Sequence, residues 1–163
     1  MSVDIQIVET NEIPTAIVWG ESVPQSQMMT FYDHAFEAVF ASIQQAGLHG
    51  AGPAYALYTA MGQGEDPHYD LEIGVPVNGE IDGSIELPDL ETVFGSELPE
   101  CKAATYRYTG SYDGLSQAWA DFMVAIEARG LKTGQPRWEV YVTEPTPQTD
   151  PAELVTELYC ALR

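Results

Sequence analysis

Glutamate and tyrosine residues stand at alternate positions near the carboxyl end of the chain, and side chains of these types can bind a ligand. Between residues 137 and 143, Glu139 and Tyr141 alternate with Trp138 and Val140. Because successive side chains of a strand point to opposite faces, Glu139 and Tyr141 are expected to share one face. Aromatic rings attract cations, and a partly desolvated carboxylate neutralises them. The pattern predicts a groove for a flat, apolar and often cationic small molecule.

The last β-rich segment, residues 154–162, shows the same alternation. We expect Glu157 and Tyr159 to share the open face with Glu139 and Tyr141, opposite a face that belongs to the core. This core face is expected to contain Trp138, Val140 and Val142 in one strand and Leu158, Cys160 and Leu162 in the other. An alternative interpretation is that the glutamates and tyrosines are ordinary solvent-facing residues of a half-exposed sheet.

Two amphipathic helices are expected to support these strands, one over residues 31–46 and one over residues 112–129. Apolar residues recur in both segments at helical spacing, and a glycine follows each segment and would end the helix. The stripes contain Tyr32, Phe36, Val39, Phe40 and Ile43 in the first helix, and Leu115, Trp119, Phe122 and Ile126 in the second. Thr30 and Ser111 are the expected N-terminal caps. Both aromatic stripes are predicted to face the core.

Six β-rich segments surround the helices, and the order strand, helix, strand, strand occurs twice. The segments are residues 13–19, 54–61, 69–77, 101–109, 137–143 and 154–162. Short matches support a duplication: residues 53–58 match 136–141 at a spacing of 83, and Pro14 matches Pro99 and Glu72 matches Glu157 at a spacing of 85. The sequence predicts an α+β fold of duplicated β-α-β-β units with pseudo-twofold symmetry. Its antiparallel sheets would carry helices on one face and a ligand groove on the other.

A single domain is expected to contain both halves, because 163 residues form about one domain. The first half would span about residues 1–78, a loop rich in glycine and acidic residues would connect the halves over about 79–96, and the second half would span about 97–163. The spacing of 83 matches Tyr58 with Tyr141 and Ala56 with Glu139. The small Ala56 would leave room on one side of the groove, while Glu139 supplies charge from the other.

The charge of the chain argues against a polyanionic partner. There are 25 acidic and 6 basic residues, giving a formal net charge of −19, so nucleic acid and anionic membranes would be repelled. The start of the sequence lacks the pattern of a secretory signal, and Cys101 and Cys160 are not spaced as a redox or metal motif. We therefore expect a cytoplasmic protein with free thiols. Adaptation to salt is an alternative source of the acidity.

Other chemistries find little support in the sequence. His68, Asp70 and Glu72 alternate along one segment, but side chains two residues apart on a strand lie nearly 7 Å apart, so they cannot converge on one ion unaided. No nucleophile-elbow motif and no phosphate-binding glycine loop occurs. We expect neither a metal nor a cofactor.

Several motifs together resemble the GyrI-like family, the effector-binding module of AraC-type and MerR-type regulators, which has a duplicated SHS2-like fold. They are the acid-rich segment from Asp70 to Val77, the turn Gly110-Ser111-Tyr112, the Glu139-Val140-Tyr141 segment and the closing Thr156-Glu157-Leu158 segment. Tyr108 stands where members often carry His, and Ala161 where they often carry Pro, so a mechanism that needs that histidine is in doubt. The sequence lacks the helix-turn-helix of regulators, and the resemblance therefore implies a stand-alone member.

The resemblance implies a small-molecule-binding protein in which Glu139 contacts the ligand. The other candidate ligand-binding residues are Tyr58, Tyr108, Tyr112, Tyr141, Glu157 and Tyr159. A partner protein is a further possibility. Some members are associated with opening strained cyclopropane-bearing compounds, so an alternative is a hydrolase in which Glu139 is the general base toward water. A third alternative, based on charge alone, is an acidic inhibitor of a DNA-binding protein.

Overall fold

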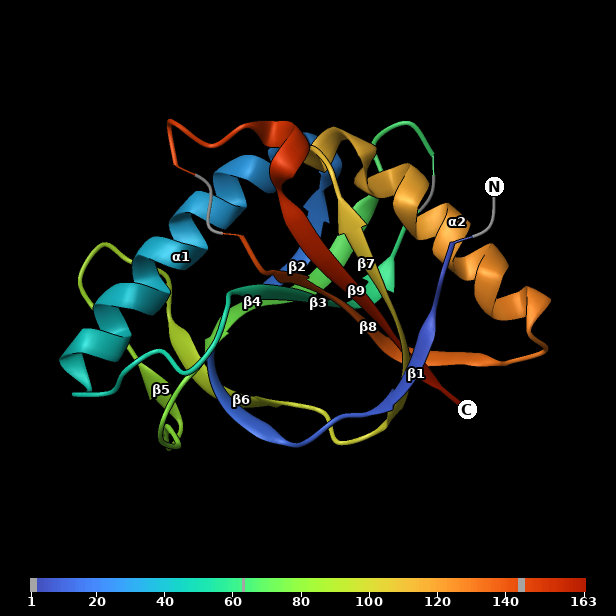
Figure 1. Ribbon diagram of the computed structural model, residues 1–163. Helices are drawn as coiled ribbons and strands as arrows, with labels where there is room; N and C mark the ends of the chain where they lie inside the picture. Colours follow the sequence, from blue (N-terminus) through green and yellow to red (C-terminus); the bar gives the residue numbers. More distant parts are fainter. Residues whose placement is uncertain (1–2, 63, 144–145) are drawn as a thin grey trace. The chain divides into compact units, whose positions relative to one another are not determined.

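The computed structural model describes residues 3–62, 64–143 and 146–163 (Figure 1). It has the expected α+β fold, with antiparallel strands and two α-helices. The chain divides into two compact units: unit 1 contains Met1–Asn11 and Glu100–Arg163, and unit 2 contains Glu12–Pro99. Neither helix is long and apolar enough to cross a membrane, as far as the described residues show.

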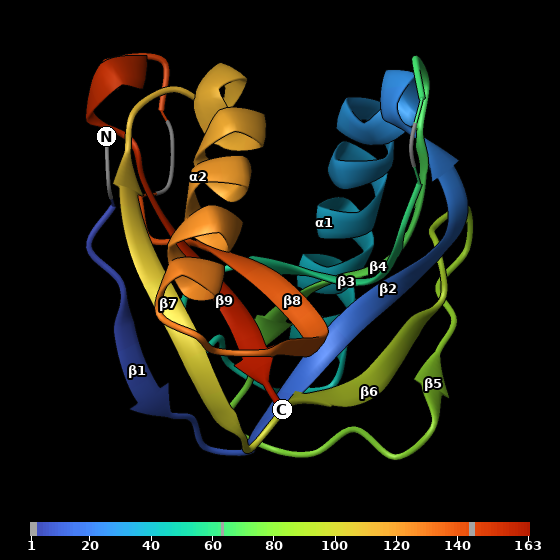
Figure 2. The same ribbon diagram turned by 90° about the vertical axis from the view of Figure 1, so that its right-hand side faces the viewer.

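Unit 1 contains a four-stranded antiparallel sheet and one α-helix. Its elements are β1 (Gln6–Glu9), β7 (Lys102–Thr109), the 3-10 turn η2 (Tyr112–Gly114), α2 (Leu115–Ala128), β8 (Thr133–Tyr141), the 3-10 turn η3 (Pro151–Glu153) and β9 (Val155–Leu162). The strand order in this unit is β1-β7-β9-β8. The helix α2 packs against the sheet over β7 (Figure 2).

Unit 2 contains five antiparallel strands and the other α-helix. Its elements are β2 (Ile13–Pro24), the 3-10 turn η1 (Gln25–Gln27), α1 (Met28–Gln45), β3 (Tyr55–Met61), β4 (His68–Pro76), β5 (Ser84–Ile85) and β6 (Val93–Leu98). The strand order is β3-β4-β2-β6-β5. The helix α1 packs against β2 and β4 (Figure 2).

The register of the strands confirms the duplicated β-α-β-β unit. Tyr58 is paired with Leu71 in unit 2, and the spacings of 83 and 85 map this pair onto Tyr141 and Thr156, which are paired in unit 1. The third sequence match, between Pro14 and Pro99, was wrong. The strands β2 and β7 correspond at a spacing of 88, because Trp19 is paired with Glu72 as Arg107 is paired with Glu157.

The expected connection over residues 79–96 differs from the structure. It contains β5 and most of β6, and β6 is paired with β2 through residues such as Phe94 and Ile17. The strand β1, which the sequence analysis did not predict, is paired with β7 in the corresponding way. Both strands are short and have no clean alternation, so their pairing partners rather than their own composition define them.

Both helices end as expected but begin differently. Gly47 and Gly130 adopt positive φ angles of 71° and 72°, and the next amide, of Leu48 or Leu131, donates to the carbonyl of the isoleucine five residues earlier. The first helix begins at Met28, so Thr30 lies inside it and does not cap it. The second α-helix begins at Leu115, directly after η2. The side chain of Ser111 makes no capping hydrogen bond to η2 or to α2.

The aromatic stripe of α1 is only partly in the core. Its buried face contains small and β-branched residues: Ala35, Ala38, Val39, Ser42 and Ile43, together with Met28. Tyr32 and Phe36 are half-buried, and Phe40 is 54 % exposed. The prediction that the whole stripe faces the core was therefore wrong for Phe40. In α2, by contrast, Phe122 and Ile126 are fully buried.

The core of unit 1 lies between α2 and one face of the sheet. It consists of Ala104, Ala118, Phe122, Ile126, Leu158 and Cys160. Glu139 is paired with Leu158, and directly paired residues of antiparallel strands project to the same face, so Glu139 lies on the face that α2 covers. Trp138 is paired with Tyr159 on the opposite face. The expected grouping of Trp138 and Val140 with Leu158 was wrong, and Val142 is 38 % exposed.

Candidate ligand-binding site

Glu139 is a buried carboxylate held by two neutral hydrogen-bond donors. Only 5 % of the residue is exposed. The indole Nε1 of Trp119 donates to its Oε1 at 2.7 Å, and the hydroxyl of Tyr141 donates to its Oε2 at 2.7 Å. One donor comes from α2 and the other from the same strand two residues on, so the helix and the strand together fix the carboxylate.

Burial raises the pKa of Glu139 above its usual range, because desolvation penalises the ionised form. The hydrogen bonds from Tyr141 and Trp119 act in the opposite direction, since they stabilise the anion. No cationic side chain forms an ion pair with this carboxylate among the described residues. Within the described part of the chain, the negative charge of this desolvated acid is therefore stabilised by the hydrogen bonds from Trp119 and Tyr141.

Tyr112 and Tyr141 extend the site with aromatic surface. Their rings meet edge to face, with centroids 5.9 Å apart and planes at 72°. Tyr112 is 40 % exposed, and its pKa is raised first by burial and then by the charge of Glu139. Tyr112 therefore lies close enough to the Glu139 carboxylate to interact with its charge, and it is exposed enough to contact a ligand.

Tyr108 holds the turn that carries Tyr112. Its hydroxyl donates to the carbonyl oxygen of Ser111 at 2.7 Å. A Cβ atom at Gly114 would collide with the same hydroxyl, so glycine is needed for this close approach. Tyr108 thus stabilises the turn before α2 through its hydrogen bond to Ser111. This is the position at which GyrI-like proteins often carry histidine.

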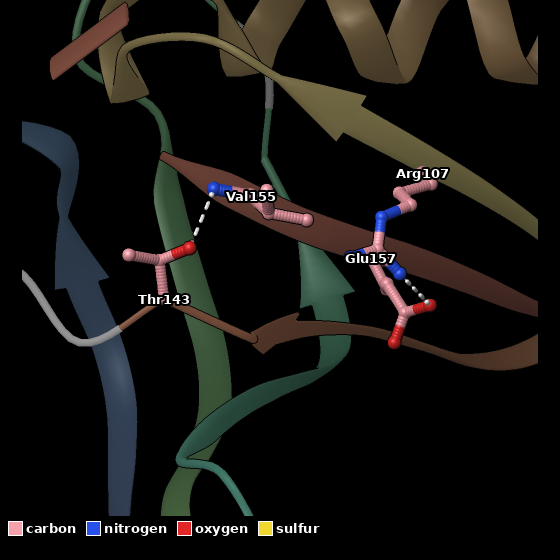
Figure 3. Close-up of polar contacts among 4 residues, drawn as sticks. All are labelled: Arg107, Thr143, Val155 and Glu157. Carbon is pink, nitrogen blue, oxygen red and sulfur yellow. Dashed lines mark hydrogen bonds and ion pairs between the residues drawn. The ribbon is translucent and has the colours of Figure 1, made fainter. Parts of the chain in front are cut away.

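A hydrogen bond beyond the end of β8 maintains the register that places Tyr141. The backbone amide of Val155 donates to Oγ1 of Thr143 at 3.1 Å (Figure 3). The backbone amides of Val142 and Thr143 both donate to the carbonyl oxygen of Val155. Pairing of β8 with β9 thereby continues past the Tyr141–Thr156 pair. The Tyr141 hydroxyl is held on the face of Glu139 as a result.

Two of the candidate residues lie on the other face of this sheet. Glu157 forms an ion pair with Arg107 at 3.7 Å (Figure 3). Tyr159 stacks on Trp138, with centroids 5.1 Å apart and planes at 3°. The prediction that Glu157 and Tyr159 share a face with Glu139 was wrong, because the register pairs them with Val140 and Trp138.

Tyr58 belongs to unit 2, where it lies on the face covered by α1. Its hydroxyl is 2.9 Å from that of Tyr32, and its ring meets that of Tyr69 edge to face at 5.7 Å. Tyr32 begins an aromatic row on α1 that continues through Phe36 to the exposed Phe40, with centroids about one helical turn apart, at 6.3 and 6.2 Å. Unit 2 thus presents an aromatic helix surface but has Ala56 at the position of Glu139.

Trp119 is the site residue that the sequence analysis assigned to another role. It was expected as a core residue of the α2 stripe, and it does contact Phe122 at a centroid distance of 5.7 Å. An indole N–H that is removed from water usually has an acceptor, and that of the partly buried Trp119 donates to Glu139. The requirement for an acceptor is a signal in the sequence, but the identity of the acceptor depends on the fold.

Replacing Trp119 with phenylalanine should lower the free energy of unfolding by about 1.5–3 kcal/mol, because the buried Glu139 anion loses a charge-assisted hydrogen bond. Urea denaturation above the raised pKa of Glu139 measures this loss. The matched control is Trp19→Phe, because Trp19 is 42 % exposed and lies in unit 2. A Trp119→Phe protein no less stable than the control would show that the Trp119–Glu139 bond contributes little.

Comparisons with known proteins identify the fold and the family. The model of the GyrI-like small molecule binding domain matches residues 4–163. No curated protein sequence matches significantly.

Several solved structures resemble the chain at low identity. The EcmrR C-terminal domain is similar with a TM-score of 0.81 and 18 % identity, covering 100 % of this chain and 99 % of that one. SAV2435 bound to tetraphenylphosphonium has a TM-score of 0.64 and 13 % identity, over 98 % and 94 % of the two chains. A hydrolase from Listeria innocua has a TM-score of 0.64 and 12 % identity, over 99 % and 93 %. Together with the duplicated strand register, the family match over almost the whole sequence leads to one conclusion: the chain belongs to the GyrI-like family of small-molecule-binding domains.

Proposed function

We propose that the protein binds hydrophobic organic cations, and that Glu139 is the residue that selects for positive charge. The observation that carries this proposal is the buried carboxylate, which has two hydrogen-bond donors and no cationic partner among the described residues. A bound cation would compensate the cost of keeping the anion desolvated.

The chemistry around the carboxylate favours large, delocalised cations. Tyr112 and Tyr141 offer ring faces and edges, and aromatic faces attract a cation without demanding hydrogen bonds from it. Such contacts tolerate variation in ligand shape, which supports binding of several related compounds. The structure of SAV2435 contains tetraphenylphosphonium, a cation of this class. Tetraphenylphosphonium is therefore a suitable probe for this protein.

The same geometry favours binding over hydrolysis. As a general base, Glu139 would have to take a proton from a water molecule. Both carboxylate oxygens already accept a hydrogen bond, and the residue is almost completely buried. Turnover of a cyclopropanoid beyond one equivalent would nevertheless support the hydrolase alternative, and the absence of turnover alongside saturable cation binding would support the binding protein.

Replacing Glu139 with glutamine should weaken binding of tetraphenylphosphonium by about 1–3 kcal/mol, because the isosteric amide removes the charge without opening a cavity. Isothermal titration calorimetry measures this difference. Triphenylphosphine oxide is neutral and keeps three of the four phenyl rings on a tetrahedral phosphorus, and it should bind the two proteins with nearly equal affinity.

A variant on the other face of the sheet provides the matched control. Glu157→Gln removes an acidic residue from the neighbouring strand, and Glu157 already has Arg107 as its partner. This variant changes the net charge by the same amount as Glu139→Gln, which makes it a matched control. Because Glu157 lies on the other face of the sheet, the affinity for tetraphenylphosphonium should stay nearly unchanged at physiological salt. Equal losses in both variants would mean that overall charge, rather than Glu139, attracts the cation.

A further inference from the structure

Unit 2 contains a partly buried carboxylate, that of Glu72, on the sheet face away from α1. Glu72 of β4 is paired with Trp19 of β2, so both side chains project to one face. The adjacent Gly20 projects to the other face, since a Cβ atom there would meet the ring of Phe31 in α1. Ser96 of β6 donates from Oγ to Oε1 of Glu72 at 2.8 Å. Burial raises the pKa of Glu72, and this hydrogen bond opposes the rise.

Comparison of the two duplicated halves shows that Glu157 of unit 1 has an arginine partner that Glu72 of unit 2 lacks among the described residues. In unit 1, Glu157 occupies the position of Glu72, and its paired residue in β7 is Arg107. The Arg107 guanidinium lies 3.7 Å from the Glu157 carboxylate (Figure 3). In unit 2 the position of Arg107 is taken by Trp19, and Glu72 forms no ion pair within the described part of the chain.

Two partly exposed aromatic residues lie on the same face as Glu72. Trp19 and Phe94 are each 42 % exposed. Ile17 is two residues before Trp19 in β2 and is paired with Phe94, so all three side chains share this face. A ring that is exposed beside a desolvated carboxylate combines the two features that attract an organic cation.

We propose that Trp19, Glu72, Ser96 and Phe94 form a second ligand site, called here the Trp19 site, which binds an alkylguanidinium compound in the place that Arg107 takes in unit 1. A guanidinium is planar and weakly hydrated, so it can stack on the Trp19 indole while it donates to a carboxylate. Ser96 already donates to Oε1 of Glu72, so Oε2 is the oxygen that the guanidinium contacts. This inference does not depend on Glu139, which belongs to unit 1.

The indole N–H signals of Trp19 and Trp119 distinguish the two sites in an NMR titration of the full chain, because Trp119 donates to Glu139 and Trp19 is paired with Glu72. The probe is N-benzylguanidinium, and N-benzylurea is its neutral isostere. We expect a saturable shift of the Trp19 signal with benzylguanidinium, and little shift with benzylurea. Glu72→Gln should weaken the affinity read at Trp19 about tenfold or more, since it removes the charge from a partly buried contact.

Two further variants keep the test independent of folding and of the Glu139 site. Trp19→Arg installs the arginine of unit 1, so it should form an internal pair with Glu72. Because this variant has no Trp19 indole, its titration is followed by the backbone amide signals of Glu72 and Ser96. We expect these signals not to shift, because benzylguanidinium no longer binds. Glu139→Gln should leave the Trp19 titration unchanged. An unmoved Trp19 signal in the wild type, or equal affinities of the wild type and a folded Glu72→Gln protein, would overturn the proposal whatever happens at Trp119.

Discussion

Replacing Phe122 with alanine is expected to lower the free energy of unfolding by about 3–5 kcal/mol, because a fully buried aromatic side chain leaves a cavity when it is truncated. Phe122 is 0 % exposed and lies in the core of unit 1 between α2 and the sheet. Its ring stacks on Tyr106 at 6.2 Å and contacts Trp119 at 5.7 Å. Chemical denaturation followed by circular dichroism measures the loss.

Phe40→Ala is the matched control, because both phenylalanines belong to apolar stripes of helical spacing. Phe40 is 54 % exposed, and its ring stacks on that of Phe36 in the same helix. Its replacement should cost no more than about 1 kcal/mol, and the better helix propensity of alanine should offset part of that cost. Similar losses for the two variants would contradict the assignment of Phe40 to the surface and of Phe122 to the core.

Local signals were sufficient to predict much of the fold. All six β-rich segments are strands. Both helices end two residues before Gly47 and Gly130, because the left-handed conformation after a helix end suits glycine. By contrast, β1 and β6 depend on pairing with β7 and β2, and their sequences, QIVE and VFGSEL, carry no alternation that would distinguish them from loop. Pairing between segments far apart in the sequence is a tertiary effect that a local pattern does not contain.

The sequence pattern drew attention to Glu139 and Tyr141 but did not predict the face of the sheet on which they lie. Alternation separated Glu139 from Trp138 correctly, yet both are buried, at 5 % and 3 % exposure, so alternation could not indicate which face the helix covers. The register decides this, because Glu139 is paired with Leu158 of the core and Trp138 with Tyr159. The same register groups Glu139, Tyr141 and Tyr108 with the helix face and assigns Glu157 and Tyr159 to the opposite face.

The helix-covered position of Glu139 has a consequence for ligand binding as a function of pH. The pKa of this carboxyl is raised by burial, so protonation of Glu139 begins at a higher pH than protonation of an exposed glutamate. The groups that contact it are the indole of Trp119 in α2, which does not titrate, and the hydroxyl of Tyr141 in the same strand. The nearby Tyr112 has a raised pKa. Tyrosine hydroxyls stay protonated throughout the acidic range, and Glu139 alone changes charge there within the site.

The affinity for tetraphenylphosphonium should therefore be highest above the raised pKa of Glu139 and should fall as the pH is lowered through it, because the proton and the organic cation compete for the same carboxylate. Below that pKa the affinity should fall toward that of Glu139→Gln, because protonation removes the same negative charge. Calorimetric titrations at several pH values, kept above the range in which exposed carboxyls protonate, measure the slope. Glu139→Gln should bind weakly with an almost flat profile, and triphenylphosphine oxide should show no slope with either protein. A flat wild-type profile, or the same slope in Glu139→Gln, would show that another group carries the charge that the ligand recognises.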